Sequence, residues 1–208
     1  MAKVQGVKEK LHMPLYDAFF VPGKRNGTPA KTFAEMMTDP RAIRFFIDVQ
    51  NKTRLETNLQ AAGVLPSLNT FEARAMRVVA SSLVETASIG SPPSPQQLQQ
   101  FEPNFLAELI YNSVTTLLVG EKIMIEMPTF YFPAGAGITG QFLGVVFNHG
   151  DPDPLATFRF AEPVFIEPQQ NFRVEMLFPQ GVPDPVSKSI GPIRLWVVLD
   201  GYLTRDVQ

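Results

Sequence analysis

Two segments near the end of the chain carry apolar side chains at every second position. In residues 171–178 the side chains that point one way are all apolar: Phe172, Val174, Met176 and Phe178. Successive side chains of a strand point to opposite faces, so this period of two predicts a strand with one buried and one solvated face. Residues 193–203 repeat the pattern. Each such strand must bury its apolar face, which requires a second layer of structure.

Other segments of the chain also have the composition of strands. They lie at residues 70–78, 104–119, 123–127, 141–147 and 155–160. Gly120-Glu121-Lys122 supplies a tight turn between two of them and predicts a hairpin. The strand near residue 70 is weakly sided, because apolar and charged residues occur on both faces. About seven to nine short strands separated by loops are typical of an all-β sandwich or jelly roll, with about eight strands expected here.

Helices are expected to be short and to occur early in the chain. Thr32 followed by Glu35 has the spacing of a capping box and predicts a helix that begins at residue 33. Asp39 as N-cap and Pro40 at the first helical position predict a second short helix. Its apolar face would contain Ile43, Phe46 and Ile47. A single helical turn is expected from Ser94, within the Pro/Ser/Gln-rich connector of residues 90–103.

The charge of the chain is uneven along its length. Residues 1–54 contain ten Lys/Arg and five Asp/Glu, a net charge of +5, which leaves −7 for residues 55–208. Such asymmetry predicts either a basic arm that contacts nucleic acid or membrane lipid, or a solvated terminal segment. The residues expected to make a genome or lipid contact are Lys3, Lys8, Lys10, Lys24 and Arg25.

The first thirty residues are expected to form an extended arm. Proline and glycine recur in this stretch at short intervals, which argues against a continuous helix or strand. Residues 15–21 are nevertheless too apolar for a free tail and should dock either on the chain's own body or on a neighbour. The docking residues are expected to be Leu15, Tyr16, Phe19 and Phe20. The organisation predicted is therefore a basic arm with short helices over residues 1–54 and a β-domain over residues 55–208.

Residue composition narrows the chemistry that the chain can perform. Cysteine is absent, and His12 and His149 are the two histidines, which argues against thiolate chemistry and multi-histidine metal sites. Gly135, Gly137 and Gly140 have the spacing of a dinucleotide-binding loop, but a strand candidate follows them where that loop needs a helix. Asp151-Pro-Asp-Pro reads more simply as a turn than as a catalytic carboxylate pair. We expect no catalytic residue, no cofactor, no metal and no small-molecule substrate.

The aromatic residues favour packing over ligand stacking. The chain has 17 Phe but 4 Tyr and 1 Trp. Platforms for sugars or bases tend to use Tyr and Trp, whereas Phe is typical of cores and of protein interfaces. Tyr131 and Trp196 remain candidates for such a platform.

Four segments of residues 54–208 together resemble a known family. They are Arg54-Leu-Glu-Thr-Asn-Leu-Gln-Ala-Ala-Gly-Val-Leu-Pro, Val119-Gly-Glu-Lys with Met127-Pro-Thr-Phe-Tyr-Phe-Pro-Ala-Gly, Phe165-Ile-Glu-Pro-Gln-Gln-Asn-Phe-Arg-Val-Glu, and Leu199-Asp-Gly-Tyr-Leu-Thr-Arg-Asp-Val-Gln. In this order they resemble the single jelly-roll major capsid proteins of tailless icosahedral bacterial and archaeal viruses.

The resemblance implies a structural protein and not an enzyme. Its members have an eight-stranded jelly roll, and an arm that reaches a neighbour or the shell interior. The expected function is that of a coat subunit in an icosahedral virion, with copies of itself and other virion proteins as partners, assembled in the host cytoplasm. Two alternatives stay open. One is a carbohydrate- or receptor-binding β-sandwich that uses the loop of residues 128–140, and the other is an enzyme that uses Asp151 and Asp153.

Overall fold

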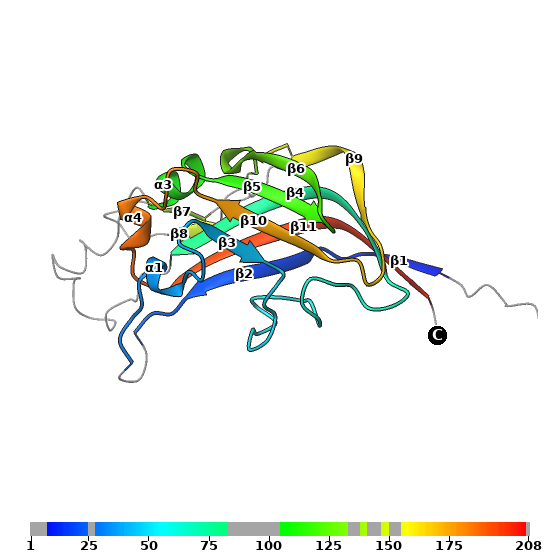
Figure 1. Cartoon of the computed structure of the whole chain (residues 1–208), viewed down its shortest axis with the longest axis horizontal. Helices are drawn as coiled ribbons and strands as arrows, with labels where there is room; N and C mark the ends of the chain where they lie inside the picture. Colours follow the sequence, from blue (N-terminus) through cyan, green and yellow to red (C-terminus); the bar gives the residue numbers. More distant parts are fainter. Residues whose placement is uncertain are drawn as a thin grey trace, which may run out of the picture.

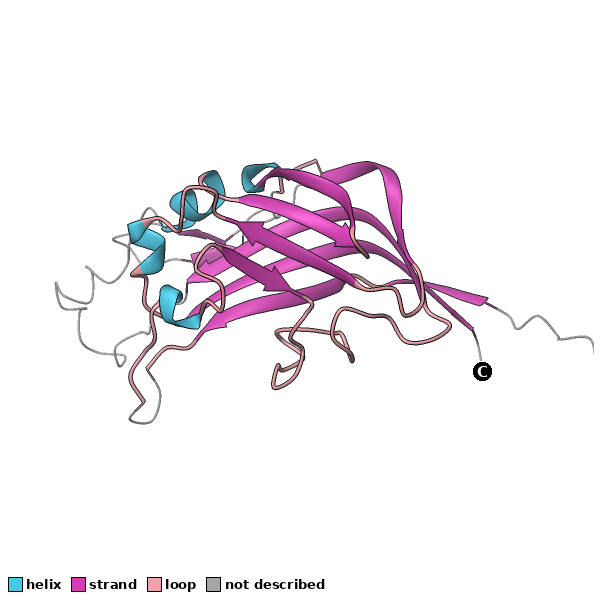
Figure 2. Ribbon diagram, viewed as in Figure 1, coloured by secondary structure: helices cyan, strands magenta, loops and turns pink. Residues whose placement is uncertain are grey.

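The computed structural model describes residues 8–24, 28–82, 105–132, 138–140, 147–149 and 155–206. In these residues the chain forms two antiparallel sheets that pack face to face, and three short helices lie at one end of the sandwich (Figures 1 and 2). The all-β sandwich predicted from the sequence is confirmed.

The first sheet consists of five strands. They are β1 (Lys8–His12), β2 (Leu15–Val21), β4 (Thr70–Ser82), β9 (Phe158–Ile166) and β11 (Ile193–Asp206). Strand β11 pairs with β4 along one side, and β4 pairs with β9. On its other side β11 pairs with β2 near its start and with β1 near its end. Strands β1 and β2 thus share the length of β11 between them.

The second sheet consists of four strands in the order β3-β10-β5-β6. Their bounds are Ala42–Phe45 for β3, Phe172–Leu177 for β10, Val114–Val119 for β5 and Lys122–Pro128 for β6. A separate hairpin joins β7 (Ile138–Gly140) to β8 (Phe147–His149). The helices are α1 (Phe33–Met36), α3 (Phe105–Tyr111), α4 (Asp184–Ser187) and the short 3-10 helix η1 (Thr129–Tyr131).

The pairing of the strands is nested along the chain. Strand β5 pairs with β6, β4 with β9, β3 with β10 and β2 with β11, all antiparallel. The chain is therefore a long two-stranded ribbon that folds back at the β5–β6 turn. Because successive pairs lie in alternate sheets, the ribbon is rolled around the core. Nested pairing with this strand order is the topology of a jelly roll.

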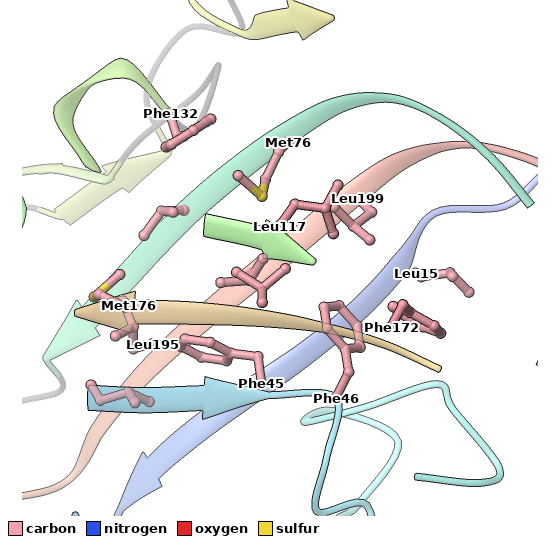
Figure 3. Packing of buried hydrophobic residues seen from close by; sticks show 14 of the residues in the cluster. Leu15, Phe45, Phe46, Met76, Leu117, Phe132, Phe172, Met176, Leu195 and Leu199 are labelled. Atoms are coloured by element: carbon pink, nitrogen blue, oxygen red, sulfur yellow. The ribbon is translucent and has the colours of Figure 1, made fainter. Parts of the chain in front are cut away.

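Apolar side chains from both sheets fill the space between them (Figure 3). Phe45, Phe172 and Met176 come from the second sheet, and Met76 and Leu195 from the first; each is at most 2% exposed. Phe46 and Phe172 lie with their ring centroids 5.3 Å apart. One continuous core therefore joins the two sheets.

Several local features predicted from the sequence are confirmed. Strand β10 buries Phe172, Val174 and Met176, and β11 buries every second residue from Ile193 to Leu203. The hairpin at Gly120 joins β5 to β6. Thr32 and Glu35 form the capping box of α1, in which each side chain accepts a hydrogen bond from the backbone of the other residue.

The weak sidedness of β4 has a structural cause. Ala73 pairs with Gly201 and Ala75 with Asp200, so Arg74 is the extra residue of a β-bulge. Before the bulge the buried residues include Phe71 and Ala73, whereas after it they include Met76 and Val78. An extra residue moves the inward-facing set by one position, which hides the period of two.

Three sequence predictions are wrong. The extended arm predicted for the first thirty residues is wrong where the structure describes them, because residues 8–12 and 15–21 form β1 and β2 of the first sheet. The helix expected from Asp39 is replaced by β3, in which Ile43 and Phe45 are buried while Arg44 between them is exposed. The strand expected over residues 104–119 begins as helix α3, and β5 starts at Val114. The helical turn expected at Ser94 lies outside the described residues.

Candidate interaction surfaces

The predicted docking segment binds to the chain's own body. All seven residues of β2 pair with β11. Leu15 is buried, and the ring of Phe19 lies 5.1 Å from that of Phe33 in α1. Tyr16 donates its hydroxyl to the backbone carbonyl of Arg54. Phe20 lies on the outer face, where the guanidinium of Arg194 stacks over its ring at 4.6 Å. A contact of these residues with a neighbouring copy stays a prediction.

The three predicted basic residues that the structure describes do not form one patch. Lys8 and Lys10 lie on β1, whereas Lys24 follows β2, and these two places are at opposite ends of the molecule (Figure 1). Lys3 and Arg25 lie outside the described residues. The lysines are separated because β1 and β2 pair with opposite ends of the long strand β11. A count of charges along the sequence does not include this arrangement.

Lys10 is already engaged within the chain. Its ammonium lies 2.6 Å from the carboxylate of Glu72 and 4.8 Å above the ring of Tyr202. Arg74 contacts the same carboxylate and stacks on the same ring. The hydrogen bonds from Lys10 and then from Arg74 lower the pKa of Glu72. Lys10 therefore offers an external anion less attraction than an unpaired lysine would.

Strand β2, at an edge of the first sheet, carries a buried carboxylate. The side chain of Asp17 is inaccessible to solvent and lies 2.9 Å from the ammonium of Lys52. The backbone N–H of Phe46 donates to the same carboxylate at 2.7 Å. Desolvation raises the pKa of Asp17, and Lys52 opposes this rise. The group joins β2 to the connection between β3 and β4, so we assign it a structural role.

The edges of the two sheets carry features that oppose the addition of another strand. The connection after β3 covers β2, because Asn58 donates its backbone N–H, and Thr57 its hydroxyl, to the carbonyl of Tyr16. Strand β3 has only four residues. Strand β9 contains Pro163, which has no N–H to donate. In β6, Leu117 pairs with Ile125 and Leu118 with Ile123, so Met124 is the extra residue of a bulge.

Three exposed aromatic rings contact one another at the helical end of the sandwich. They belong to Tyr111 of α3 and to Phe130 and Tyr131 of η1, and we call them the aromatic patch. Their exposed fractions are 68%, 46% and 49%. The Phe130 ring stacks on Tyr131 with centroids 4.8 Å apart, and Tyr111 lies 5.8 Å from Phe130. Exposed aromatic clusters of this kind are common in interaction sites.

A buried hydroxyl network holds the two helices that carry the aromatic patch. The hydroxyl of Ser113 donates to the carbonyl of Leu109 in α3 at 2.6 Å and lies 2.7 Å from the hydroxyl of Thr129. The hydroxyl of Thr115 lies 2.8 Å from the same Thr129 oxygen. The backbone N–H of Thr129 donates to the carbonyl of Ser113, so η1 is fixed to the start of β5. All three hydroxyl residues are at most 2% exposed. The network therefore fixes the base of the patch while its rings face solvent.

The described part of the chain contains no group of three or more His, Asp or Glu side chains arranged to hold a metal ion. Within the same residues, no helix has the length and apolarity needed to cross a membrane. Asp151 and Asp153, and the glycines at 135 and 137, lie outside the described residues. Comparison with protein-family models, with curated proteins and with solved structures finds no match to this chain.

Sequence reasoning found one part of the aromatic patch and missed another. Tyr131 was expected in a loop, and its ring is exposed as a platform would require. Trp196 instead donates its indole N–H to the carbonyl of Leu55 on the outer face of the first sheet. Tyr111 was missed because its segment reads as a strand. A helical signal was present, since the apolar residues Phe105 and Leu109 lie four positions apart, as do Leu106 and Ile110.

Proposed function

We propose that this chain is a virion structural protein, a coat subunit that assembles with copies of itself into an icosahedral shell. The observation that carries the proposal is the nested pairing of eight strands into a jelly roll. This topology supports the jelly roll expected from the four segments that resemble capsid proteins. Two of those segments form parts of β10 and β11. A fold alone does not specify a function, so the surface must supply further support.

The surface supports the proposal in two ways. The sheet edges are covered, bulged or short, which keeps crowded subunits from merging through strand addition. The aromatic patch exposes apolar rings on a fixed base, which suits a contact between proteins. Repeated modest contacts of this kind can close a shell, because each subunit makes several of them.

Assembly of the purified protein tests the proposal. Light scattering and electron microscopy should show capsomers or closed shells as the protein concentration rises. A compact monomer that persists at high concentration, over a range of salt and pH, would contradict the proposal. A packaging ATPase encoded beside this chain's gene would support it independently.

A carbohydrate- or receptor-binding sandwich is the second candidate, and the aromatic patch is the observation that favours it. Tyr131 and Tyr111 are 49% and 68% exposed, and a sugar ring could stack on exposed aromatic rings of this kind. Glycan-array binding that is lost in Tyr131→Ala, in a protein that does not self-assemble, would favour this function over the coat subunit.

Contact of the N-terminal segment with nucleic acid or lipid stays a prediction. Lys8 and Lys24 are exposed, whereas Lys10 is held by Glu72. Binding through these residues should weaken steeply with added salt, as measured by retention of labelled DNA or of anionic vesicles. A binding constant that is insensitive to salt would contradict an electrostatic contact.

A further inference from the structure

We propose that residues 47–62, in the connection between β3 and β4, form a hinged cover that opens as one unit while the β-sandwich stays folded. We call these residues the cover loop. In the closed form, which the structure shows, the cover loop takes the place along the edge of β2 that an added strand would take. This opening is a property of the fold and does not depend on the proposed function.

The two ends of the cover loop are joined and fixed to the sandwich. The backbone N–H of Gly63 donates to the carbonyl of Phe46 at 2.6 Å, and the N–H of Phe172 in β10 donates to the carbonyl of Gly63 at 2.8 Å. Phe46 and Gly63 are both buried, and both have a positive φ, of 70° and 60°. A surface loop with joined ends is an Ω-loop, a type that is frequently functional. The neck formed by Phe46 and Gly63 is therefore a fixed base about which the loop can open.

At the edge of β2, Asn58 replaces a neighbouring strand. Its side-chain amide accepts a hydrogen bond from the N–H of Tyr16 at 3.0 Å and donates one to the carbonyl of Pro14 at 2.7 Å. Its own backbone N–H donates to the carbonyl of Tyr16 at 3.4 Å. One residue thus satisfies main-chain groups of β2 that face away from β11.

Further polar contacts hold the cover loop on the two faces of β2. On the inner side, the ammonium of Lys52 lies 2.9 Å from the carboxylate of Asp17. On the outer face, the hydroxyl of Tyr16 donates to the carbonyl of Arg54, and the carbonyl of the next residue accepts the indole N–H of Trp196. The cover loop therefore clamps β2 from three sides.

The cover loop contributes little apolar surface to the core. Its buried residues are Glu56 and Thr57, which are both polar. Ile47 and Leu55 are 41% and 58% exposed, and Leu59 is only partly buried against the core. Segments with few buried apolar contacts open at a lower free energy than the core does. Opening of the cover loop breaks polar contacts that water can replace, so it costs less than unfolding of the sandwich.

A turn inside the cover loop keeps its own structure when the loop opens. The N–H and the hydroxyl of Thr53 both donate to the carboxylate of Glu56, at 2.7 and 3.0 Å. The N–H groups of Glu56 and Thr57 donate to the carbonyl of Thr53. None of these bonds involves β2, so the loop can move as one unit.

Hydrogen exchange measured for single amides by NMR tests the proposal. The N–H groups of Tyr16 and Asn58 bond across the contact between β2 and the cover loop, so both are released on opening. The N–H of Asp17 faces β11, because successive residues of a strand alternate, and the N–H of Gly63 belongs to the neck. Tyr16 and Asn58 should share one protection factor, about 100-fold or more below those of Asp17 and Gly63.

Two outcomes of this measurement would overturn the proposal. Equal protection of all four amides would show that the loop opens only when the sandwich unfolds. Different protection of Tyr16 and Asn58 would show that the two sides of the contact do not separate in one event. Exchange of Asp17 as fast as that of Tyr16 belongs to the first outcome, because β2 would then leave β11 as well.

A conservative variant provides a second readout. Tyr16→Phe removes the hydroxyl that bonds to Arg54, and it should speed the exchange of Asn58 by about two- to tenfold while the core amides keep their rates. Tyr202→Phe is the matched control, because this ring contacts Lys10 toward the end of β11 that pairs with β1. The control should leave the exchange of Asn58 unchanged. Faster exchange in both variants, or in neither, would contradict the proposed clamp.

Discussion

The carboxylate of Asp17 and the ammonium of Lys52 lie 2.9 Å apart, and the carboxylate is fully shielded from solvent. This pair joins β2 to the connection that follows β3. Phe46, which has a positive φ of 70°, donates its backbone N–H to the same carboxylate. One buried side chain thus stabilises an unusual backbone conformation and the cover over β2.

Replacement of Asp17 should be costly. Asp17→Ala removes the partner of a mostly buried lysine and of a buried N–H, and breaking such a pair typically costs about 3–5 kcal/mol. Urea unfolding at neutral pH measures the change in the free energy of unfolding. Glu9→Ala, which breaks the exposed pair with Arg205, is the control and should cost about 1 kcal/mol or less. Similar losses in both variants would contradict a special role for Asp17.

The raised pKa of Asp17 gives a pH dependence with a definite sign. Desolvation makes the folded chain bind the proton of Asp17 more tightly than the unfolded chain does, whose value is 3.8. The stability linked to this proton is fully present below pH 3.8 and is lost as pH rises through the folded pKa. Wild type should therefore gain stability relative to Asp17→Asn as the pH falls toward 3.8. Denaturant titrations of both proteins at several pH values measure the difference in their free energies of unfolding. A difference that shifts toward Asp17→Asn as the pH falls would contradict the prediction.

Thr129→Val should destabilise the base of the aromatic patch. The substitution keeps the shape of the side chain but removes the partner of the buried Thr115 hydroxyl, while Ser113 keeps its bond to the carbonyl of Leu109. The expected loss is about 1–3 kcal/mol in thermal or urea unfolding. Thr116→Val is the control, because Thr116 makes a long bond of 3.4 Å to Glu126. An equal loss in the control would show that the network has no particular importance.

Gly201→Ala should distort the pairing of β11 with β4. A Cβ atom at this position would lie 2.0 Å from the backbone carbonyl oxygen of Glu72, well inside contact distance. Gly120→Ala is the comparison, since its Cβ would meet nothing within 4 Å and the cost there comes from a positive φ of 60°. That conformational cost is about 1–2 kcal/mol. Gly201→Ala should lower the melting temperature further than Gly120→Ala; the reverse order would contradict the close approach.

The parts of the fold that follow from local pattern were predictable. Strand β10 and the hairpin at Gly120 depend on alternation and turn chemistry, which neighbouring residues specify. Strand β3 was mistaken for a helix because Asp39 and Pro40 are also good helix starts. The segment forms a strand because Ile43 pairs with Met176 of β10 in the folded chain, and this tertiary contact outweighs the local preference.

The candidate site was less predictable than the fold. Tyr111 and Phe130 are far apart in sequence, and their contact depends on Thr129 and Ser113 joining η1 to β5. The place of β2 could not be read from its own residues either. The prolines and glycines around it suggested an extended arm without a continuous strand, but they lie at or beyond the ends of β2, where they interrupt no pairing with β11.

The nested pairing of the strands has a consequence for synthesis. Strand β11 lies between β4 and the first two strands, so neither β1 nor β2 has its partner until residues 193–206 have left the ribosome. During translation the apolar segment of residues 15–21 must wait unpaired, which favours delayed folding and a requirement for chaperones.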